Sequence, residues 1–150
     1  MKRILQYVLI GLGIAFIAIQ FFSVERSNPP VTGLVDAPEE VLTTLRRSCW
    51  DCHSNETEWP WYSYVAPVSW RVAQHVRMAR EHVNFTEWDS YDAEELDEAF
   101  EEIAEEIEKS GMPLGDYLLV HRNAKLTTAD RERLISWAES ARERMVVPGQ

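Results

Sequence analysis

A run of about 19 apolar residues near the start of the chain, residues 4–22, constrains the fold more than any other feature. Only Gln6 and Gln20 interrupt this run. As a helix it is long enough to cross a hydrocarbon core of about 30 Å, and it lacks the polar stripe of an ordinary amphipathic helix. A cleaved signal peptide is the alternative, but the run exceeds the usual apolar core of such a peptide and no A-x-A-like site follows it. The sequence therefore predicts an uncleaved membrane anchor over residues 1–23.

The charges on either side of the anchor predict its orientation. Lys2 and Arg3 precede the apolar run, and the positive-inside rule keeps them in the cytoplasm. Everything after Ser23 is then expected on the periplasmic or outer side of the cell membrane. This part carries 25 Asp+Glu against 13 Lys+Arg, a net charge of -12. Such an acidic domain lacks the electrostatic footprint of a phosphate-binding protein, which argues against nucleic acid as a partner.

Proline and glycine separate the anchor from the rest of the chain. Residues 24–35 contain Pro29, Pro30 and Gly33 and are expected to form an extended linker. Residues 36–148 then form a single domain, because a chain of 150 residues leaves little room for another. With only two cysteines, this domain must depend on a packed core or a cofactor.

Helical periodicity predicts an all-α domain with long irregular stretches. The first helix should begin with a capping box of Asp36 and Glu39 and run into Cys49. The next helix should bury a stripe that includes Val68, Val76 and other small apolar residues. The three later helices are expected at residues 67–83, 93–109 and 127–144, and the irregular stretches at residues 49–64 and 110–126.

Both cysteines of the chain lie in Cys49-Trp50-Asp51-Cys52-His53, and the C-x-x-C-H spacing is the attachment signature of c-type haem. Two thiols at this spacing can form thioether bonds to the two vinyl groups of one porphyrin. The histidine that follows then lies under the iron as the proximal ligand. The sequence therefore predicts one covalent haem c on Cys49 and Cys52, with His53 as an axial iron ligand.

Three other interpretations of these residues are weaker. A thioredoxin-like dithiol uses C-x-x-C, but it belongs to a βαβ pattern that this chain lacks. A structural zinc site needs four well-placed ligands, and the chain has no second cysteine pair. A disulfide between Cys49 and Cys52 would close a very short loop and leave His53 unexplained.

Met112 is the predicted distal ligand of the iron. It follows a helix that is expected to end at Gly111, and Pro113 stiffens the loop that presents its thioether. Ligation by histidine and methionine raises the reduction potential relative to nitrogen donors. The other candidates are His121, then His75 and His82, with Met78 and Met145 behind them.

Further segments match a known pattern beyond the haem motif. A short helix that leads into C-x-x-C-H, a later Gly-Met-Pro loop and a C-terminal helix resemble class I cytochrome c. The additional segments are His53-Ser54-Asn55-Glu56-Thr57, Trp59-Pro60-Trp61-Tyr62-Ser63-Tyr64, Ala66-Pro67-Val68-Ser69-Trp70, Glu81-His82-Val83-Asn84-Phe85, Met112-Pro113 and Ala124-Lys125-Leu126-Thr127. With these segments the chain, from residue 36 to residue 145, resembles the bacterial haem-binding domain family. The resemblance implies covalent haem c on Cys49 and Cys52 with His53 as axial ligand, and it is compatible with Met112 opposite.

The sequence thus predicts a membrane-anchored, monohaem c-type cytochrome with a cytochrome c-like helical domain. It would transfer single electrons outside the cytoplasm through its iron and would not be an enzyme. A haem-based sensor or peroxidase-like accessory domain with an open distal position is the alternative, and a C-x-x-C thiol oxidoreductase is less favoured. The expected partner is a redox protein. The carboxylates along one face of the helix at residues 93–109 are either a docking surface for a basic patch on that partner or a solvated face.

Overall fold

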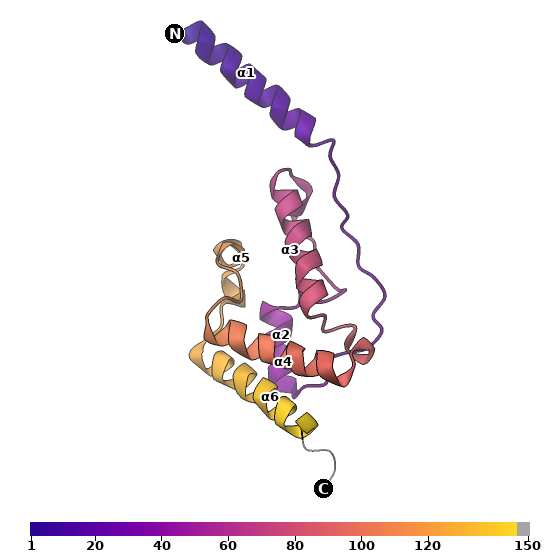
Figure 1. The fold of residues 1–150 in the computed structure, drawn as a ribbon. Coiled ribbons are helices and arrows are strands. Elements are labelled where there is room, and N and C mark those ends of the chain that lie inside the picture. Colours follow the sequence, from indigo (N-terminus) through magenta and orange to yellow (C-terminus); the bar gives the residue numbers. More distant parts are fainter. Residues whose placement is uncertain (147–150) are drawn as a thin grey trace.

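The computed structural model describes residues 1–146, and within this range the protein is all-helical (Figure 1). Six α-helices and three short 3-10 helices follow one another along the described chain. The α-helices are α1 (Lys2–Ile19), α2 (Glu39–Ser48), α3 (Val68–His82), α4 (Ala93–Glu108), α5 (Gly115–Val120) and α6 (Thr128–Val146). The 3-10 helices are η1 (Trp61–Tyr64), η2 (Trp88–Ser90) and η3 (Arg122–Ala124).

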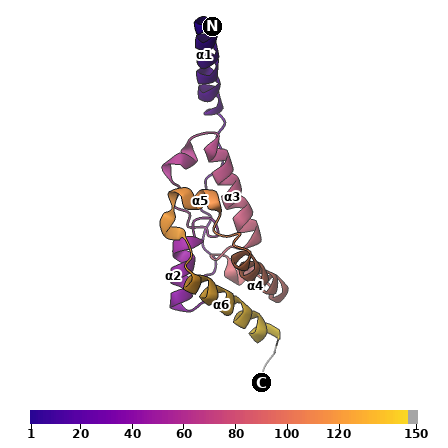
Figure 2. The ribbon, with the colours of Figure 1, turned by 90° about the vertical axis from the view of Figure 1, so that its left-hand side faces the viewer.

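The first helix, α1, projects away from the other helices (Figures 1 and 2). None of its residues is buried against the rest of the molecule. Among the described residues it is the one helix long and apolar enough to cross a membrane, by length and composition. Its bounds lie within the segment that the sequence predicts as an anchor.

Residues 24–35, which we call the strap, are extended and run along the domain (Figure 1). The backbone N–H groups of Thr32 and Val35 donate to the carbonyl groups of Thr86 and Phe85, at 3.0 and 2.9 Å. Gly33 accepts from the backbone N–H of Trp88 at 3.1 Å. A Cβ atom at position 33 would overlap Asp89, so this close approach requires glycine. The strap is therefore joined to the domain by backbone hydrogen bonds.

Capping decides where two of the helices begin. The expected capping box at Asp36 is wrong, because α2 begins only at Glu39 with Pro38 as its N-cap residue. A proline disfavours helical geometry in the residue before it, so the helix cannot extend back to Asp36. The capping box of the structure lies at α4 instead, where the carboxylate of Asp92 accepts from the N–H groups of the first turn.

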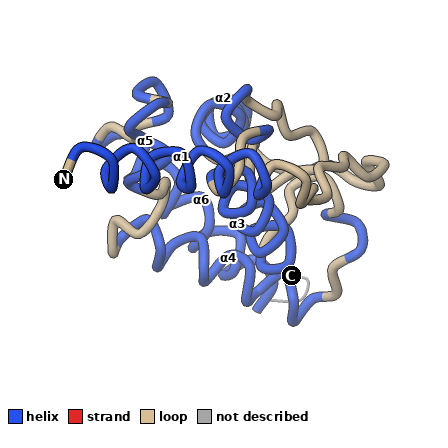
Figure 3. The backbone as a smooth tube through the Cα atoms, turned by 90° about the horizontal axis from the view of Figure 1, so that it is seen from above, coloured by secondary structure: helices blue, strands red, loops and turns tan. Residues whose placement is uncertain are grey.

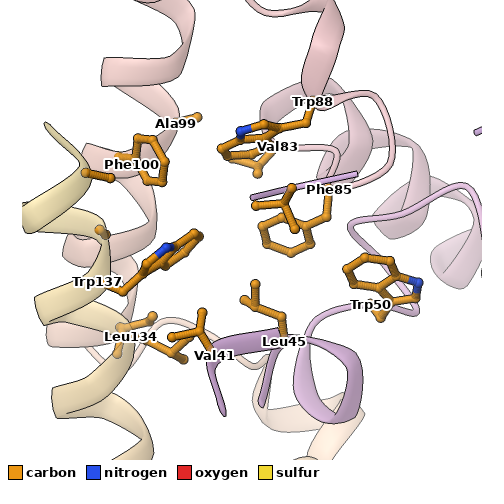
Figure 4. Close-up of a cluster of buried hydrophobic side chains, with 14 of the residues drawn as sticks. Val41, Leu45, Trp50, Val83, Phe85, Trp88, Ala99, Phe100, Leu134 and Trp137 are labelled. Carbon is orange, nitrogen blue, oxygen red and sulfur yellow. The ribbon is translucent and has the colours of Figure 1, made fainter. Parts of the chain in front are cut away.

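The core forms where α4 and α6 pack along each other and α2 closes one side. Figure 4 shows Leu45, Phe85, Phe100 and Trp137 pointing into this shared interior. The rings of Phe100 and Trp137 meet edge to face with centroids 5.2 Å apart. Both helices therefore turn an apolar face toward the core. The apolar residues of α4 and α6 that are buried are Ala99, Phe100, Ile107, Leu134, Trp137, Ala138 and Ala141.

Two features of the remaining helices differ from the prediction. Val76 of α3 is buried as expected, but Val68 at its start is 46% exposed. The stretch predicted to be irregular at residues 110–126 contains α5 and η3, although loops still connect the helices there (Figure 3). At six residues, α5 is too short to show a helical period in its sequence.

Candidate haem site

The five residues of the C-x-x-C-H motif form a tight turn at the end of α2. Cys49 is the C-cap residue, and its N–H donates to the carbonyl of Leu45 at 2.8 Å. The carbonyl of Cys49 then accepts from the N–H groups of Cys52 and His53, at 3.2 and 3.0 Å. Because the turn folds back on Cys49, the two thiols and the imidazole all line one cavity.

The imidazole of His53 is oriented by a residue that is far away in the sequence. Its Nδ1 atom lies 2.9 Å from the carbonyl oxygen of Val83, at the end of α3. Since a carbonyl oxygen only accepts, Nδ1 carries the hydrogen, and the lone pair of Nε2 is left for a metal. Burial lowers the pKa of His53, so the ring is neutral at neutral pH. A neutral, oriented imidazole is what an axial iron ligand requires.

The cavity beside this turn has a volume of about 550 Å³ and is bounded by parts of α2, α3, α4 and α5. Its size falls within the range of cofactor sites, which are mostly apolar with a few polar groups. The lining residues that carry no charge and no metal-ligating atom are Leu45, Ser48, Ala79, Val83, Phe85, Ile103, Ile107, Pro113, Leu114 and Tyr117. A flat apolar ring system would find mostly hydrocarbon around it here.

Met112 lies in the same cavity as the motif, on the loop between α4 and α5. The loop turns sharply at Ser110, whose φ of 57° is left-handed. The N–H groups of Gly111 and Met112 both donate to the carbonyl of Glu106, at 2.9 and 3.4 Å. The turn at the end of α4 thus holds the thioether beside the cavity that the two cysteines and His53 also line.

The structure separates the other candidate ligands into two groups. His75, Met78 and His82 on α3 also line the cavity. His121 is not part of the lining; its ring stacks on Tyr117 with centroids 4.1 Å apart. Met145 packs against the hydrophobic core. The cavity therefore brings together the four predicted site residues and three of the five alternatives.

The two thiols are free and lie in surroundings that favour their protonated form. Burial raises the pKa of Cys49 to about 12. Burial, followed by the nearby carboxylate of Asp51, raises the pKa of Cys52 to about 11. The cysteines of dithiol oxidoreductases have lowered pKa values, because they lie at helix N-termini or beside positive charges. These two thiols lie at a helix C-terminus and show the opposite shift.

A buried polar network supports the turn after His53. The side-chain amide of Asn84 donates to Asn55 at 2.9 Å, and the Thr86 hydroxyl donates to Asn84 at 2.8 Å. The N–H of Asn55 in turn donates to the hydroxyl of Thr86 at 2.7 Å. This network joins the segment that follows the motif, at Asn55, to the segment that follows α3, at Asn84 and Thr86. It therefore fixes the turn relative to the end of α3.

Two residues near the site carry no signal in the sequence. The phenol of Tyr117, on α5, lines the cavity and donates to the Asp51 carboxylate at 2.8 Å. The guanidinium of Arg80, on α3, donates to the carbonyl of Ser54 and to the hydroxyl of Thr57, both at 2.8 Å. Tyr117 thus joins the motif, and Arg80 the turn just after it, to helices that lie at least 23 positions away in the chain. Sequence spacing alone cannot reveal such contacts.

The cavity and its donor set fit a haem. The thiols of Cys49 and Cys52, the oriented imidazole of His53 and the thioether of Met112 line a largely apolar space, and groups of these kinds hold a c-type haem. Within residues 1–146, no group of three or more His, Cys, Asp or Glu side chains is arranged to hold a bare metal ion.

Comparison with known proteins agrees with this geometry. No curated protein and no solved structure matches the chain. The family model described as the haem-binding domain matches residues 14–140, which include the strap, the C-x-x-C-H turn and every residue of the cavity. This match covers most of the chain, and the chain therefore belongs to the haem-binding domain family.

Proposed function

We propose that this haem-binding protein is a membrane-anchored c-type cytochrome that carries one covalent haem and transfers single electrons outside the cytoplasm. The observation that carries the proposal is the convergence of Cys49, Cys52, His53 and Met112 on one cavity. A haem bound there supplies a one-electron couple between ferric and ferrous iron.

Each of these side chains has a distinct role. The sulfur atoms of Cys49 and Cys52 hold the porphyrin covalently, so the cofactor stays with the chain in both oxidation states. His53 would hold the iron through Nε2, because its Nδ1 is engaged by the carbonyl of Val83. Met112 would offer its thioether to the iron from the loop between α4 and α5, and such ligation would favour the ferrous state.

The proposed location rests on α1. This helix is long and apolar enough to span a bilayer, and Lys2 and Arg3 precede its apolar part. The positive-inside rule then leaves the haem domain on the periplasmic or outer side, where c-type haem is attached. The helix remains as an anchor in this proposal.

The proposed partner is a redox protein with a basic docking surface. Carboxylates cover the solvent face of α4, and Glu102, Glu105 and Glu106 of this helix also line the cavity. An acidic surface at the edge of the cavity would steer a basic partner to the point where electrons leave and enter.

The decisive experiment is a haem stain of the denatured protein after expression with the cytochrome c maturation machinery. We expect haem to remain with the unfolded wild-type chain and to be lost in a Cys49→Ala/Cys52→Ala variant. Ser48→Ala is the matched control, because Ser48 also lines the cavity but has no thiol. Colourless wild-type protein with two titratable thiols would overturn covalent attachment.

The absorption spectrum of the same samples tests electron transfer against the sensor alternative. A carrier should show low-spin iron in both oxidation states and reversible one-electron reduction. A reduced protein with high-spin iron that binds carbon monoxide readily would instead favour the sensor or peroxidase-like function.

A further inference from the structure

Six exposed side chains form a surface on the part of the domain where the chain arrives from α1. We call Trp61, Tyr64, Val68, Trp70, Leu119 and Val120 the apolar patch. Trp61 is 79% exposed, Leu119 is 75% exposed and Val120 is 64% exposed. Large exposed apolar surfaces on small domains mark contacts with a protein or a membrane.

Tyr62 connects the part of the patch on η1 and α3 with the part at the end of α5. Its ring centroid lies 5.9 Å from that of Trp61, in η1, and 6.1 Å from that of His121. His121 directly follows Leu119 and Val120 at the end of α5. The 3-10 helix η1 and the end of α5, which are distant in sequence, therefore lie side by side.

The end of α1 is fastened beside the patch. The side chain of Gln20 makes two hydrogen bonds to the backbone of Ala66, donating to its carbonyl at 3.1 Å and accepting from its N–H at 2.9 Å. The indole N–H of Trp70 donates to the carbonyl of Phe22 at 3.2 Å. Figures 1 and 2 both show α1 ending directly beyond the tip of α3. A helix that leaves a bilayer at Phe22 therefore brings the patch to the bilayer surface.

The chemistry of the patch suits a lipid headgroup region. Tryptophan and tyrosine concentrate at membrane–water interfaces, where the ring is embedded and its polar atom stays wet. The guanidinium of Arg26 lies 4.4 Å from the ring centroid of Tyr64 and adds a cation at this level.

The charges of the domain favour the same surface. Residues 59–80 and 117–129 contain no carboxylate, although the chain has 25 in total. The carboxylates concentrate elsewhere, above all on α4, which lies away from α1 (Figure 1). Two carboxylates remain nearby: Glu25 shares a pocket with Trp70, and Asp116 pairs with Arg71 at 2.8 Å. The segments that carry the patch themselves present only apolar and basic groups to an anionic lipid surface.

We propose that the apolar patch is a second membrane contact, which seats the domain on the headgroups of the bilayer that α1 crosses. This inference rests on the proposed anchoring by α1. Other occupants, such as a second copy of the chain or a partner protein, would leave the patch without lipid contact in an isolated monomer.

The test uses the full, haem-loaded chain in nanodiscs of phosphatidylethanolamine and phosphatidylglycerol, with one chain per disc. A single cysteine is introduced at Leu9 in α1, at Leu119 in the patch, or at Ser136 on the exposed face of α6, and is labelled with a nitroxide. The collisions of the nitroxide with a water-soluble nickel chelate and with oxygen are then measured. We expect the label at 119 to collide with the chelate several-fold less often than the label at 136.

The three positions distinguish the two proposals. A label at 119 as accessible as that at 136, with the label at 9 protected, would overturn the membrane contact and leave the anchor intact. Access of the chelate to position 9 as well would overturn the anchor and the inference together.

A second variant tests the side chains themselves. Trp61→Ser/Tyr64→Ser should raise the chelate accessibility at 119 several-fold, because it removes the aromatic groups that hold the patch at the interface. Leu34→Ser is the matched control, since Leu34 is 52% exposed but lies at the far end of the strap. Equal accessibility in all three backgrounds would contradict the proposal.

Discussion

Met112 and Met78 present the same chemical group to the same cavity from different elements. Met112 lies on a loop that is bonded back to α4 at Glu106, whereas Met78 is on α3 and is 43% exposed. A thioether binds iron only weakly, so its position has to be fixed by the chain that presents it. This difference in support favours Met112 as the distal ligand.

We expect Met112→Ala to convert the six-coordinate, low-spin iron to a form that binds carbon monoxide, and to lower the reduction potential. Loss of the thioether removes the ligand that favours the ferrous state. Absorption spectroscopy and a redox titration measure both effects. Met78→Ala should leave the spectrum and the potential unchanged, and the reverse pattern would assign the ligand to α3.

Asp130 links the start of α6 to α2. Its carboxylate accepts from the N–H of Thr127 at 2.9 Å, from the hydroxyl of Thr127 at 2.8 Å and from the guanidinium of Arg47 at 2.8 Å. The backbone N–H of Thr127 is the main cause that lowers the pKa of Asp130 to about 2. A lowered folded-state pKa means that the ionised carboxylate stabilises the fold above its unfolded pKa of about 4, and that this contribution is lost as the pH falls toward 2.

We therefore expect Asp130→Asn to lower the free energy of unfolding by about 1–2 kcal/mol at pH 7. The difference from wild type should shrink between pH 4 and pH 2, because the wild-type carboxyl group is protonated there. Denaturant unfolding of the full chain in detergent measures both. Glu139→Gln, on the exposed side of α6, is the control. A difference that stays constant down to pH 2 would show that the charge of Asp130 is not responsible.

At the scale of helices, hydrophobic periodicity predicts which segments are helical better than capping residues predict where a helix begins. The apolar stripes of α4 and α6 repeat over several turns, so both helices and their buried faces could be predicted. Asp36 looks like an N-cap in the sequence, but Pro38 moves the start of α2 past it. Helix α5 was not predicted, because its six residues bury nothing and show no period.

In the candidate site too, residues that belong to a local sequence pattern could be predicted, and residues that arrive through tertiary packing could not. The C-x-x-C-H spacing is local, so Cys49, Cys52 and His53 could be named from the sequence, and the turn after α4 pointed to Met112. The carbonyl of Val83 and the phenol of Tyr117 reach the motif only through tertiary packing. No pattern in a single sequence encodes which backbone carbonyl an imidazole will meet.

The carboxylates on the solvent face of α4 should affect the rate of electron transfer with charged acceptors. Replacing Glu94, Glu98 and Glu108, which are exposed, by glutamine should slow electron transfer to hexaammineruthenium(III) several-fold at low salt. It should speed transfer to the anion hexacyanoferrate(III). Both effects should fade as the ionic strength rises, because salt screens exposed charges.

A control with the same change in net charge separates a docking face from a general field. Glu132, Glu139 and Glu143 are exposed on α6 and can be replaced in the same way. If the stopped-flow rates of transfer to hexaammineruthenium(III) fall equally in both triple variants, the face of α4 is a solvated surface and not a docking site.

Across the whole molecule, the helices differ in how they are stabilised. Helices α4 and α6 bury their apolar faces against each other. Helix α3 buries only Ser69 and Val76, and α5 buries no residue. Both α3 and α5 instead border the cavity. Their packing therefore depends on what fills the cavity, whereas α4 and α6 have a core of their own.

We expect a haem-free chain, produced without the maturation machinery, to lose protection from hydrogen exchange first in α3 and α5. Local opening is easiest where few apolar groups are buried. Helices α4 and α6 should stay protected, and the thermal midpoint should fall relative to the haem-loaded protein. Exchange followed by mass spectrometry resolves these helices, and a uniform loss of protection would contradict this division.

The hydrogen-bonded strap also changes how the protein meets other molecules. A free chain of about 12 residues has a root-mean-square end-to-end distance of about 20 Å, and a domain on such a tether tumbles and samples a wide volume. With the strap bonded to Thr86, Phe85 and Trp88, the domain cannot tumble independently of the helix to which it is joined. If α1 spans a bilayer, encounters then depend on lateral diffusion in two dimensions. An electron acceptor whose own site lies at the same height above the lipid then meets the cavity at a high effective concentration, and any other acceptor meets it at a low one.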